Sequence, residues 1–126
     1  MYVYYNPNPY GRLVGDCVVR AVSKVTGQSW DETYIGAVVF GFEIKNMPSG
    51  NEVWGEYLKS KGFVRTLLPD RYPSRYTVRQ FCEDNPYGVF LLATGSHAVA
   101  VVDGDYYDAW DSGDEVPMYY WSMERS

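Results

Sequence analysis

Short apolar runs dominate the second half of the chain. The most apolar of them, residues 89–93, is bounded by turn-forming residues and predicts a central β-strand. A Val-rich run follows His97, and two tyrosines come directly after the Asp-Gly-Asp sequence at residues 103–105. Because Gly supplies the positive φ of a tight turn, this arrangement predicts a β-hairpin. Residues 63–67 also have strand composition, and residues 116–121 suit an edge strand.

Helical spacing marks the first half of the chain. From Asp16 to about residue 25 the apolar positions recur every three or four residues, and Gly27 follows where a C-terminal cap is expected. Ser29 and Glu32 have the spacing of a capping box, which predicts a second helix through roughly residue 40. Gly41 then begins a predicted loop.

Two more helices are expected further along. Residues 51–61 carry apolar side chains on one helical face and are followed by Gly62. Thr77 is a typical N-cap for a short helix through residue 83, in which Cys82 points inward. Between these helices, residues 70–74 have the composition of a loop.

The order of these elements predicts the fold class. Helices come mostly first and strands second, which favours an α+β fold, with N-terminal helices packed on a C-terminal antiparallel β-sheet. A chain of 126 residues suits a single domain, residues 1–126. Two Asn-Pro pairs disfavour helix in residues 1–14, which we expect to form an extended N-terminal arm.

Composition narrows the classes of partner and cofactor. A net charge of −5 and the lack of Lys or Arg runs argue against nucleic acid as the main partner. No apolar stretch approaches a membrane span and no signal-peptide pattern opens the chain, so we expect no membrane partner and a cytoplasmic location. One histidine and two distant cysteines have no zinc-ligand spacing, and we expect no metal or cofactor.

The single histidine, His97, is the first candidate for chemistry. It pairs with Trp110 if the hairpin turn is at residues 103 and 104, and with Ser112 if the turn is one residue later. In either register Asp108 lies on the same face as His97, because side chains of paired strands share a face at every second residue. Such a carboxylate holds one ring nitrogen and leaves the other free.

Cys17 is the candidate nucleophile. It opens the first predicted helix, where partial positive charge and free amides favour the thiolate. Asp16 is expected to cap that helix. Arg20, one turn further on, is expected either to pair with an acidic group near the site or to lie on the surface. A lone cysteine is more often a small core residue, but this combination of residues favours a Cys–His–Asp site.

These residues resemble the papain-like cysteine peptidase superfamily. There a Cys starts the first long helix, a His opens a strand of a later sheet, and an Asn or Asp ends the next strand, which Cys17, His97 and Asp108 match. The resemblance implies that Trp110 shields the His–Asp contact. Asp-Cys-Val-x-Arg-Ala at 16–21 and His-x-Val-Ala-Val-x-Asp-Gly at 97–104 are similar to motifs of small papain-like proteins of bacteriophages and gut bacteria.

The N-terminal arm departs from the superfamily pattern. Papain-like enzymes commonly carry a Gln shortly before the cysteine as an oxyanion donor, but Gly11 stands six residues before Cys17 and no Gln precedes it. Asn6 or Asn8 is an alternative donor, together with the backbone amide of Cys17. The chain is also shorter than a full papain domain, which leaves the substrate groove undefined.

The resemblance implies a cysteine peptidase or amide hydrolase that acts on a peptide or protein through a thioester acyl-enzyme. A deamidase or transglutaminase-like enzyme is an alternative, since the same three residues serve these reactions. A second alternative is a catalytically silent papain-like module that binds a host or virion protein. A structural subunit of an assembly is the third.

Overall fold

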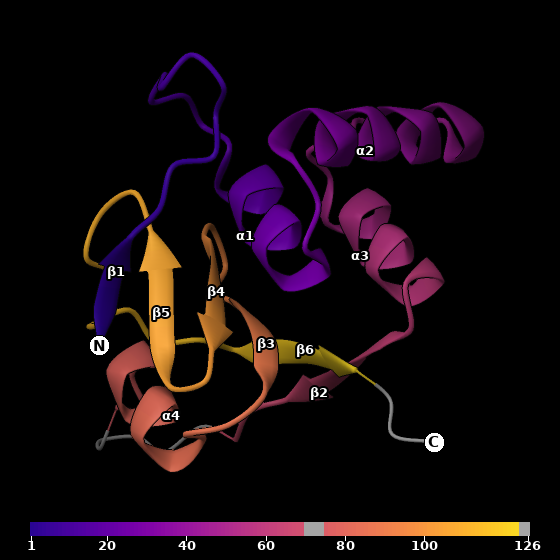
Figure 1. The fold of residues 1–126 in the computed structure, drawn as a ribbon. Coiled ribbons are helices and arrows are strands. Elements are labelled where there is room, and N and C mark those ends of the chain that lie inside the picture. The colour runs from indigo at the N-terminus through magenta and orange to yellow at the C-terminus, as the bar shows by residue number, and fades with distance from the viewer. Residues whose placement is uncertain (70–74, 124–126) are drawn as a thin grey trace.

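The computed structural model describes residues 1–69 and 75–123, and over these residues it has the predicted α+β composition (Figure 1). The loop expected at residues 70–74 lies outside the described residues. The four described helices are α1 (Cys17–Thr26), α2 (Trp30–Ile44), α3 (Asn51–Ser60) and α4 (Val78–Asp84). The six described strands are β1 (Tyr2–Tyr4), β2 (Phe63–Leu67), β3 (Val89–Ala93), β4 (Ala98–Val102), β5 (Asp105–Asp108) and β6 (Tyr119–Met123).

The described strands form one sheet in the order β1-β5-β4-β3-β6-β2. The expected hairpin is β4–β5, in which Val102 pairs with Asp105. Asp103 and Gly104 both have positive φ, as a two-residue hairpin turn requires. The pairing is therefore the first of the two registers considered from the sequence.

Two expectations about the sheet are wrong. The N-terminal arm contributes β1, which pairs in parallel with β5, so the sheet is mixed and not purely antiparallel. The last segment forms β6, which lies between β3 and β2 and is not an edge strand. The physical reason is that Trp121 and Tyr120 pack into cores on opposite faces of the sheet, as befits an interior strand.

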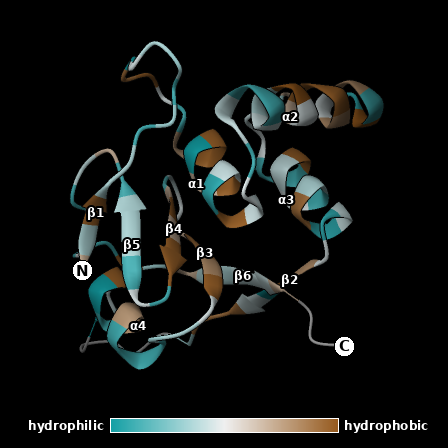
Figure 2. Cartoon of the chain, viewed as in Figure 1, coloured by the Kyte–Doolittle hydropathy of each residue, from teal (hydrophilic) through white to brown (hydrophobic). Residues whose placement is uncertain are grey.

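Both faces of the sheet are covered, because the side chains of β3 and β4 alternate between two cores. Both strands consist mostly of hydrophobic residues (Figure 2). Leu91, Ala98 and Ala100 pack with residues of α1 and α3. Leu92 and Val99 pack on the opposite face with residues of α4, including the predicted core residue Cys82. The small side chains of β4 allow α1 to pack closely beside it, which brings the start of α1 to the start of β4.

The second helix is longer than expected. It runs to Ile44 because Gly41 does not end it. A Cβ on Gly41 would lie 2.7 Å from the backbone oxygen of Asn46, so the glycine permits the following loop to approach the helix. The start was predicted correctly, since Ser29 Oγ accepts a 3.0 Å hydrogen bond from the amide of Glu32. None of the described helices has the length and apolar composition needed to cross a membrane.

Gly36→Ala is expected to destabilise the fold by about 1–3 kcal/mol, because overpacking strains a filled core. The new Cβ would lie 2.4 Å from the hydroxyl oxygen of Tyr57, whose ring is buried between α2 and α3. Gln28 Nε2 donates a 2.9 Å hydrogen bond to that hydroxyl and holds the ring in place. Urea denaturation measures the loss.

Gly55→Ala is the matched control, because it also replaces a helical glycine. Its Cβ would meet the Trp121 ring at 3.4 Å, an ordinary contact. Since Ala favours helix, we expect this change to be neutral or stabilising by up to about 1 kcal/mol. Equal losses in the two variants would show that close approach at Gly36 does not matter.

Candidate active site

The proposed nucleophile lies where the sequence placed it, at the first residue of α1. Asp16 is the N-cap residue, as predicted, although its side chain makes no capping hydrogen bond. The backbone amides of residues 17–19 have no hydrogen-bond acceptor among the described residues. The start of α1 therefore presents free donors and partial positive charge beside Cys17.

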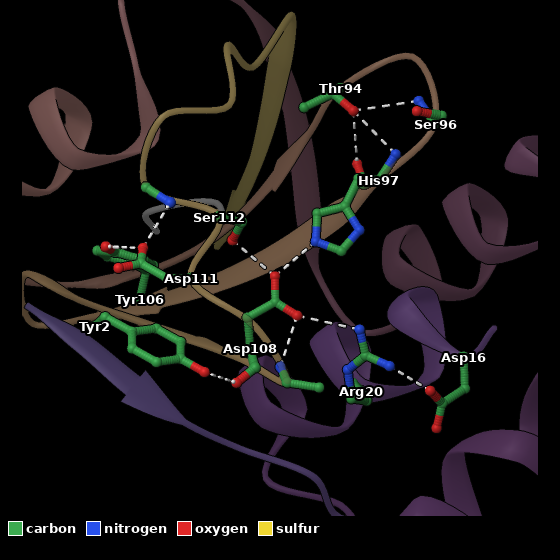
Figure 3. Close-up of polar contacts among 12 residues, drawn as sticks. Tyr2, Asp16, Arg20, Thr94, Ser96, His97, Tyr106, Asp108, Asp111 and Ser112 are labelled. Carbon is green, nitrogen blue, oxygen red and sulfur yellow. Dashed lines mark hydrogen bonds and ion pairs between the residues drawn. The ribbon is translucent and has the colours of Figure 1, made fainter. Parts of the chain in front are cut away.

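His97 lies directly before β4 and is held by a short loop. Thr94 Oγ1 accepts hydrogen bonds from the backbone amides of Ser96 at 3.2 Å and His97 at 2.9 Å (Figure 3). The imidazole Nε2 lies 2.6 Å from Oδ2 of Asp108. The side chain of His97 is 10% exposed and that of Asp108 is 1% exposed, so this contact is almost free of water.

The carboxylate of Asp108 is anchored on both oxygens. Oδ2 accepts a 2.7 Å hydrogen bond from the hydroxyl of Ser112, and Oδ1 accepts one of 2.7 Å from the amide of Ala109. Arg20 Nη2 also donates to Oδ1, at 3.1 Å (Figure 3). With this many donors the carboxylate stays ionised and fixed in orientation toward His97.

Arg20 was expected either to pair with an acidic group near the site or to lie on the surface. The structure shows the first of these. Arg20 is buried, and its Nη1 pairs with Asp16 while its Nη2 pairs with Asp108. Trp30 Nε1 donates a 2.8 Å hydrogen bond to the other oxygen of Asp16. Arg20 thus ties the helix that carries Cys17 to the carboxylate that orients His97. The Asp16–Arg20 spacing of four residues was a usable signal for this pair, whereas Ser112 was considered only as a cross-strand partner of His97 and not as a hydrogen-bond donor to Asp108.

The two cysteines have opposite electrostatic surroundings. Burial opposes ionisation of Cys17, but hydrogen bonds with the His97 side chain and the Ala98 backbone, and the charges of His97 and Arg20, lower its pKa on balance. Burial raises the pKa of Cys82 to about 11. Both cysteines are free. Of the two thiols, Cys17 is the one whose surroundings favour the thiolate.

The pKa values of His97 and Asp108 are shifted in opposite directions, and each shift favours the charged form. Burial opposes charge on His97, but the interactions with Asp108 and Cys17 outweigh it and raise the pKa of His97 to about 9. Burial also opposes charge on Asp108, yet hydrogen bonds with His97 and Ser112 lower its pKa. Thiolate, imidazolium and carboxylate therefore stabilise one another in sequence.

The remaining predicted site residues divide into two groups. Trp110 stands against the imidazole of His97, with ring centroids 4.8 Å apart, in the place expected of a shield. Asn6 and Asn8 serve the arm's own turns, where their Oδ1 atoms accept hydrogen bonds from the amides of Asn8 and Tyr10. Neither asparagine lines the cavity at Cys17, so the structure does not bring the expected side-chain oxyanion donors to the thiol.

A cavity of about 570 Å³ opens at Cys17 and His97. Its wall is mostly apolar and comes from α1, α2, α3 and the loops at residues 47–49 and 94–96. The apolar and aromatic side chains that line it are Val14, Val18, Val19, Trp30, Tyr34, Ala37, Met47, Pro48, Trp54 and Ala98. Sequence reasoning had left this groove undefined, because residues from four separate segments of the chain form it.

Comparisons of the chain with family models, curated proteins and solved structures find no match. The geometry of the site itself is therefore the basis on which we infer its function. Among the described residues, no group of three or more His, Cys, Asp or Glu side chains is placed to hold a metal ion. The chemistry that the arrangement can perform is that of an activated thiol beside an acid–base imidazole.

Proposed function

We propose that the protein is a papain-like cysteine peptidase or related amide hydrolase with a Cys17–His97–Asp108 triad. The observation that carries this proposal is the alignment of a thiol of lowered pKa, an imidazole and a buried carboxylate at the wall of an apolar cavity. The order helix-tip Cys, strand-start His and strand-end Asp supports the papain-like assignment.

The first half of the proposed reaction forms a thioester. The Cys17 thiolate attacks the amide carbonyl carbon, and the electron pair moves to the carbonyl oxygen. The free backbone amides at the start of α1 are the proposed donors to that oxyanion. The C–N bond then breaks as the imidazolium of His97 gives its proton to the departing nitrogen, which leaves as an amine.

The second half releases the acid. Neutral His97 takes a proton from water as the hydroxide adds to the thioester carbonyl, and the C–S bond breaks to return the thiolate and imidazolium. Asp108 keeps Nε2 of the ring engaged throughout. Trp110 keeps water from that contact. The reaction needs a reduced thiol and no cofactor, and we place it in a reducing, cytoplasmic compartment.

The cavity supports a peptide or protein as the substrate. Its apolar wall suits an uncharged side chain next to the scissile amide, since a charged group would lose hydration there. Asp16 at the wall is engaged by Arg20 and by the indole N–H of Trp30, so both of its carboxylate oxygens already have donors within the protein.

Incubation with a mixture of peptides from a digested proteome, followed by mass spectrometry, tests the proposal. Wild type and Cys82→Ala are expected to generate new peptide termini, whereas Cys17→Ala is expected to generate none. Cys82→Ala is the matched control because it removes the other thiol. Side-chain deamidation or amine incorporation without new termini would replace the peptidase by the alternative enzymes. No change in any peptide, with Cys17 reactive toward small alkylating agents, would favour the silent binding module.

A further inference from the structure

Ser112, in the loop between β5 and β6, shares a hydrogen-bond acceptor with the imidazole of His97. Its hydroxyl donates a 2.7 Å hydrogen bond to Oδ2 of Asp108, and the same oxygen lies 2.6 Å from Nε2 of His97 (Figure 3). Ser112 and Asp108 are each 1% exposed, so this contact is shielded from water. A second donor on one carboxylate oxygen takes up part of its negative charge and weakens its attraction for the first donor.

The backbone on either side of the hydroxyl is fixed by α4, which lies on the opposite face of the sheet from α1. The amides of Val78 and Arg79, at the start of α4, donate to the carbonyl oxygens of Glu115 and Gly113 at 2.9 and 3.0 Å. Gly113 also has no room for a side chain, because a Cβ there would lie 2.4 Å from a tyrosine hydroxyl on β5. Ser112 is therefore held in place by the chain around it as well as by its own hydrogen bond.

The electrostatics of the pair give this hydrogen bond a chemical consequence. Burial opposes charge on His97, but hydrogen bonds with Asp108 and Cys17 raise its pKa to about 9. A proton donor works best when its pKa lies near the working pH, so a still stronger hold by Asp108 would slow proton release. Burial also opposes ionisation of Asp108, whereas hydrogen bonds with His97 and Ser112 lower its pKa and so make it a weaker proton acceptor.

We propose that Ser112 is a positioning residue of the triad, which acts through Asp108 to keep the His97 imidazolium able to give up its proton. The proton leaves from Nδ1, the ring nitrogen that Asp108 does not hold, and passes to the departing nitrogen as the C–N bond breaks. The inference rests on the proposed function, because this proton transfer is a step of the proposed hydrolysis. Ser112 does not line the cavity at Cys17.

Other titratable and charged groups surround the His97–Asp108 pair, and Ser112→Ala leaves all of them in the chain. They are Cys17 and Arg20 on α1, Asp16 at its N-cap, Tyr2 on β1 and Asp111 beside Ser112. Of these groups, Cys17 forms an ion pair directly with the imidazolium, so its effect has to be removed before that of Ser112 is measured.

NMR titration of His97 gives the direct measurement, because it is the single histidine of the chain. The background is Cys17→Ala, which removes the thiolate. Adding Ser112→Ala is expected to raise the midpoint of the His97 titration by about half a pH unit or more, because Oδ2 then serves the imidazolium alone. Ser23→Ala is the matched control, since Ser23 is also 1% exposed but donates to the backbone oxygen of Arg20. An unchanged or lowered midpoint with Ser112→Ala overturns the proposal.

Two rates in the chain with its thiol separate this role from a purely structural one. Alkylation of Cys17 by iodoacetamide needs only the thiolate, whereas cleavage of the peptide mixture also needs the proton of His97. Ser112→Ala is expected to move the rise of alkylation to lower pH and to lower the plateau rate of cleavage about twofold or more. A loss of structure would slow both reactions, and that result, or cleavage that is not slowed, overturns the proposal.

The same experiment distinguishes failure of this inference from failure of the proposed function. Wild type that cleaves no peptide overturns the proposed function, and with it the proposed proton transfer to an amine. Wild type that cleaves peptides, together with an unshifted His97 titration in the Ser112→Ala variant, leaves the proposed function in place and overturns the role of Ser112 alone.

Discussion

Iodoacetamide is expected to alkylate Cys17 at least about 100-fold faster than Cys82 at pH 6. The thiolate is the reactive species, and an ordinary thiol is less than about 1% ionised at that pH. Hydrogen bonding with His97 and the Ala98 amide lowers the pKa of Cys17 despite burial, whereas burial raises that of Cys82 to about 11. Mass spectrometry of alkylated peptides measures both rates in one sample.

The pH dependence of the Cys17 alkylation rate tests for an ion pair between the Cys17 thiolate and the His97 imidazolium. A lowered pKa means that Cys17 becomes reactive at a lower pH than an ordinary thiol, so its rate begins to rise at a lower pH than that of an ordinary thiol. His97→Ala removes the imidazole that stabilises the thiolate, and the rise should move toward the pH of an ordinary thiol. Ser96→Ala changes the neighbouring residue and is the control. A profile that His97→Ala leaves unchanged would contradict the triad.

Arg20→Met is expected to cost about 3–5 kcal/mol of unfolding free energy, the loss typical of a broken buried ion pair. The guanidinium is buried between the carboxylates of Asp16 and Asp108. Methionine fills similar space but leaves both acids without their cation. Urea denaturation at neutral pH measures the loss, and the Cys17 alkylation profile of the folded fraction should move to higher pH, because Arg20 helps to lower the thiol pKa.

Arg79→Met is the matched control, since Arg79 also pairs with two aspartates, Asp111 and Asp114. Its side chain is 48% exposed, and water and salt screen the pairs. Exposed ion pairs contribute little to stability, so this variant should lose far less unfolding free energy than Arg20→Met. Similar losses in the two variants would mean that burial of Arg20 adds nothing to the strength of its pairs.

Local signals in the sequence predicted most of the site. The Asp103-Gly104 pair specified the hairpin, and the hairpin placed Asp108 beside His97. The helical spacing after Gly15 placed Cys17 at the tip of a helix. These signals worked because turn geometry and helix periodicity depend only on neighbouring residues.

The features of the fold and the site that were not predicted from the sequence depend on residues far apart in the chain. The parallel pairing of β1 with β5 joins segments about 100 residues apart, and nothing in Tyr2–Tyr4 specifies that partner. Gly41 is typical of the end of a helix, but it lies inside α2. There its lack of a side chain lets the backbone of Asn46 approach the helix. Whether an arginine is buried, as Arg20 is, depends on which elements cover it, and periodicity alone does not say.

The distance along the chain between Cys17 and its partners, His97 and Asp108, determines at what point in synthesis the site can form. Residues 1–5 hold the backbone of Asp108 through hydrogen bonds from the Tyr2 hydroxyl and the Tyr5 amide. On the ribosome Cys17 emerges about 80 to 90 residues before the imidazole of His97 and the carboxylate of Asp108. A nascent chain therefore carries Cys17 as an ordinary thiol until the β4–β5 hairpin has emerged, and the lowered thiol pKa depends on long-range contacts that form after that point.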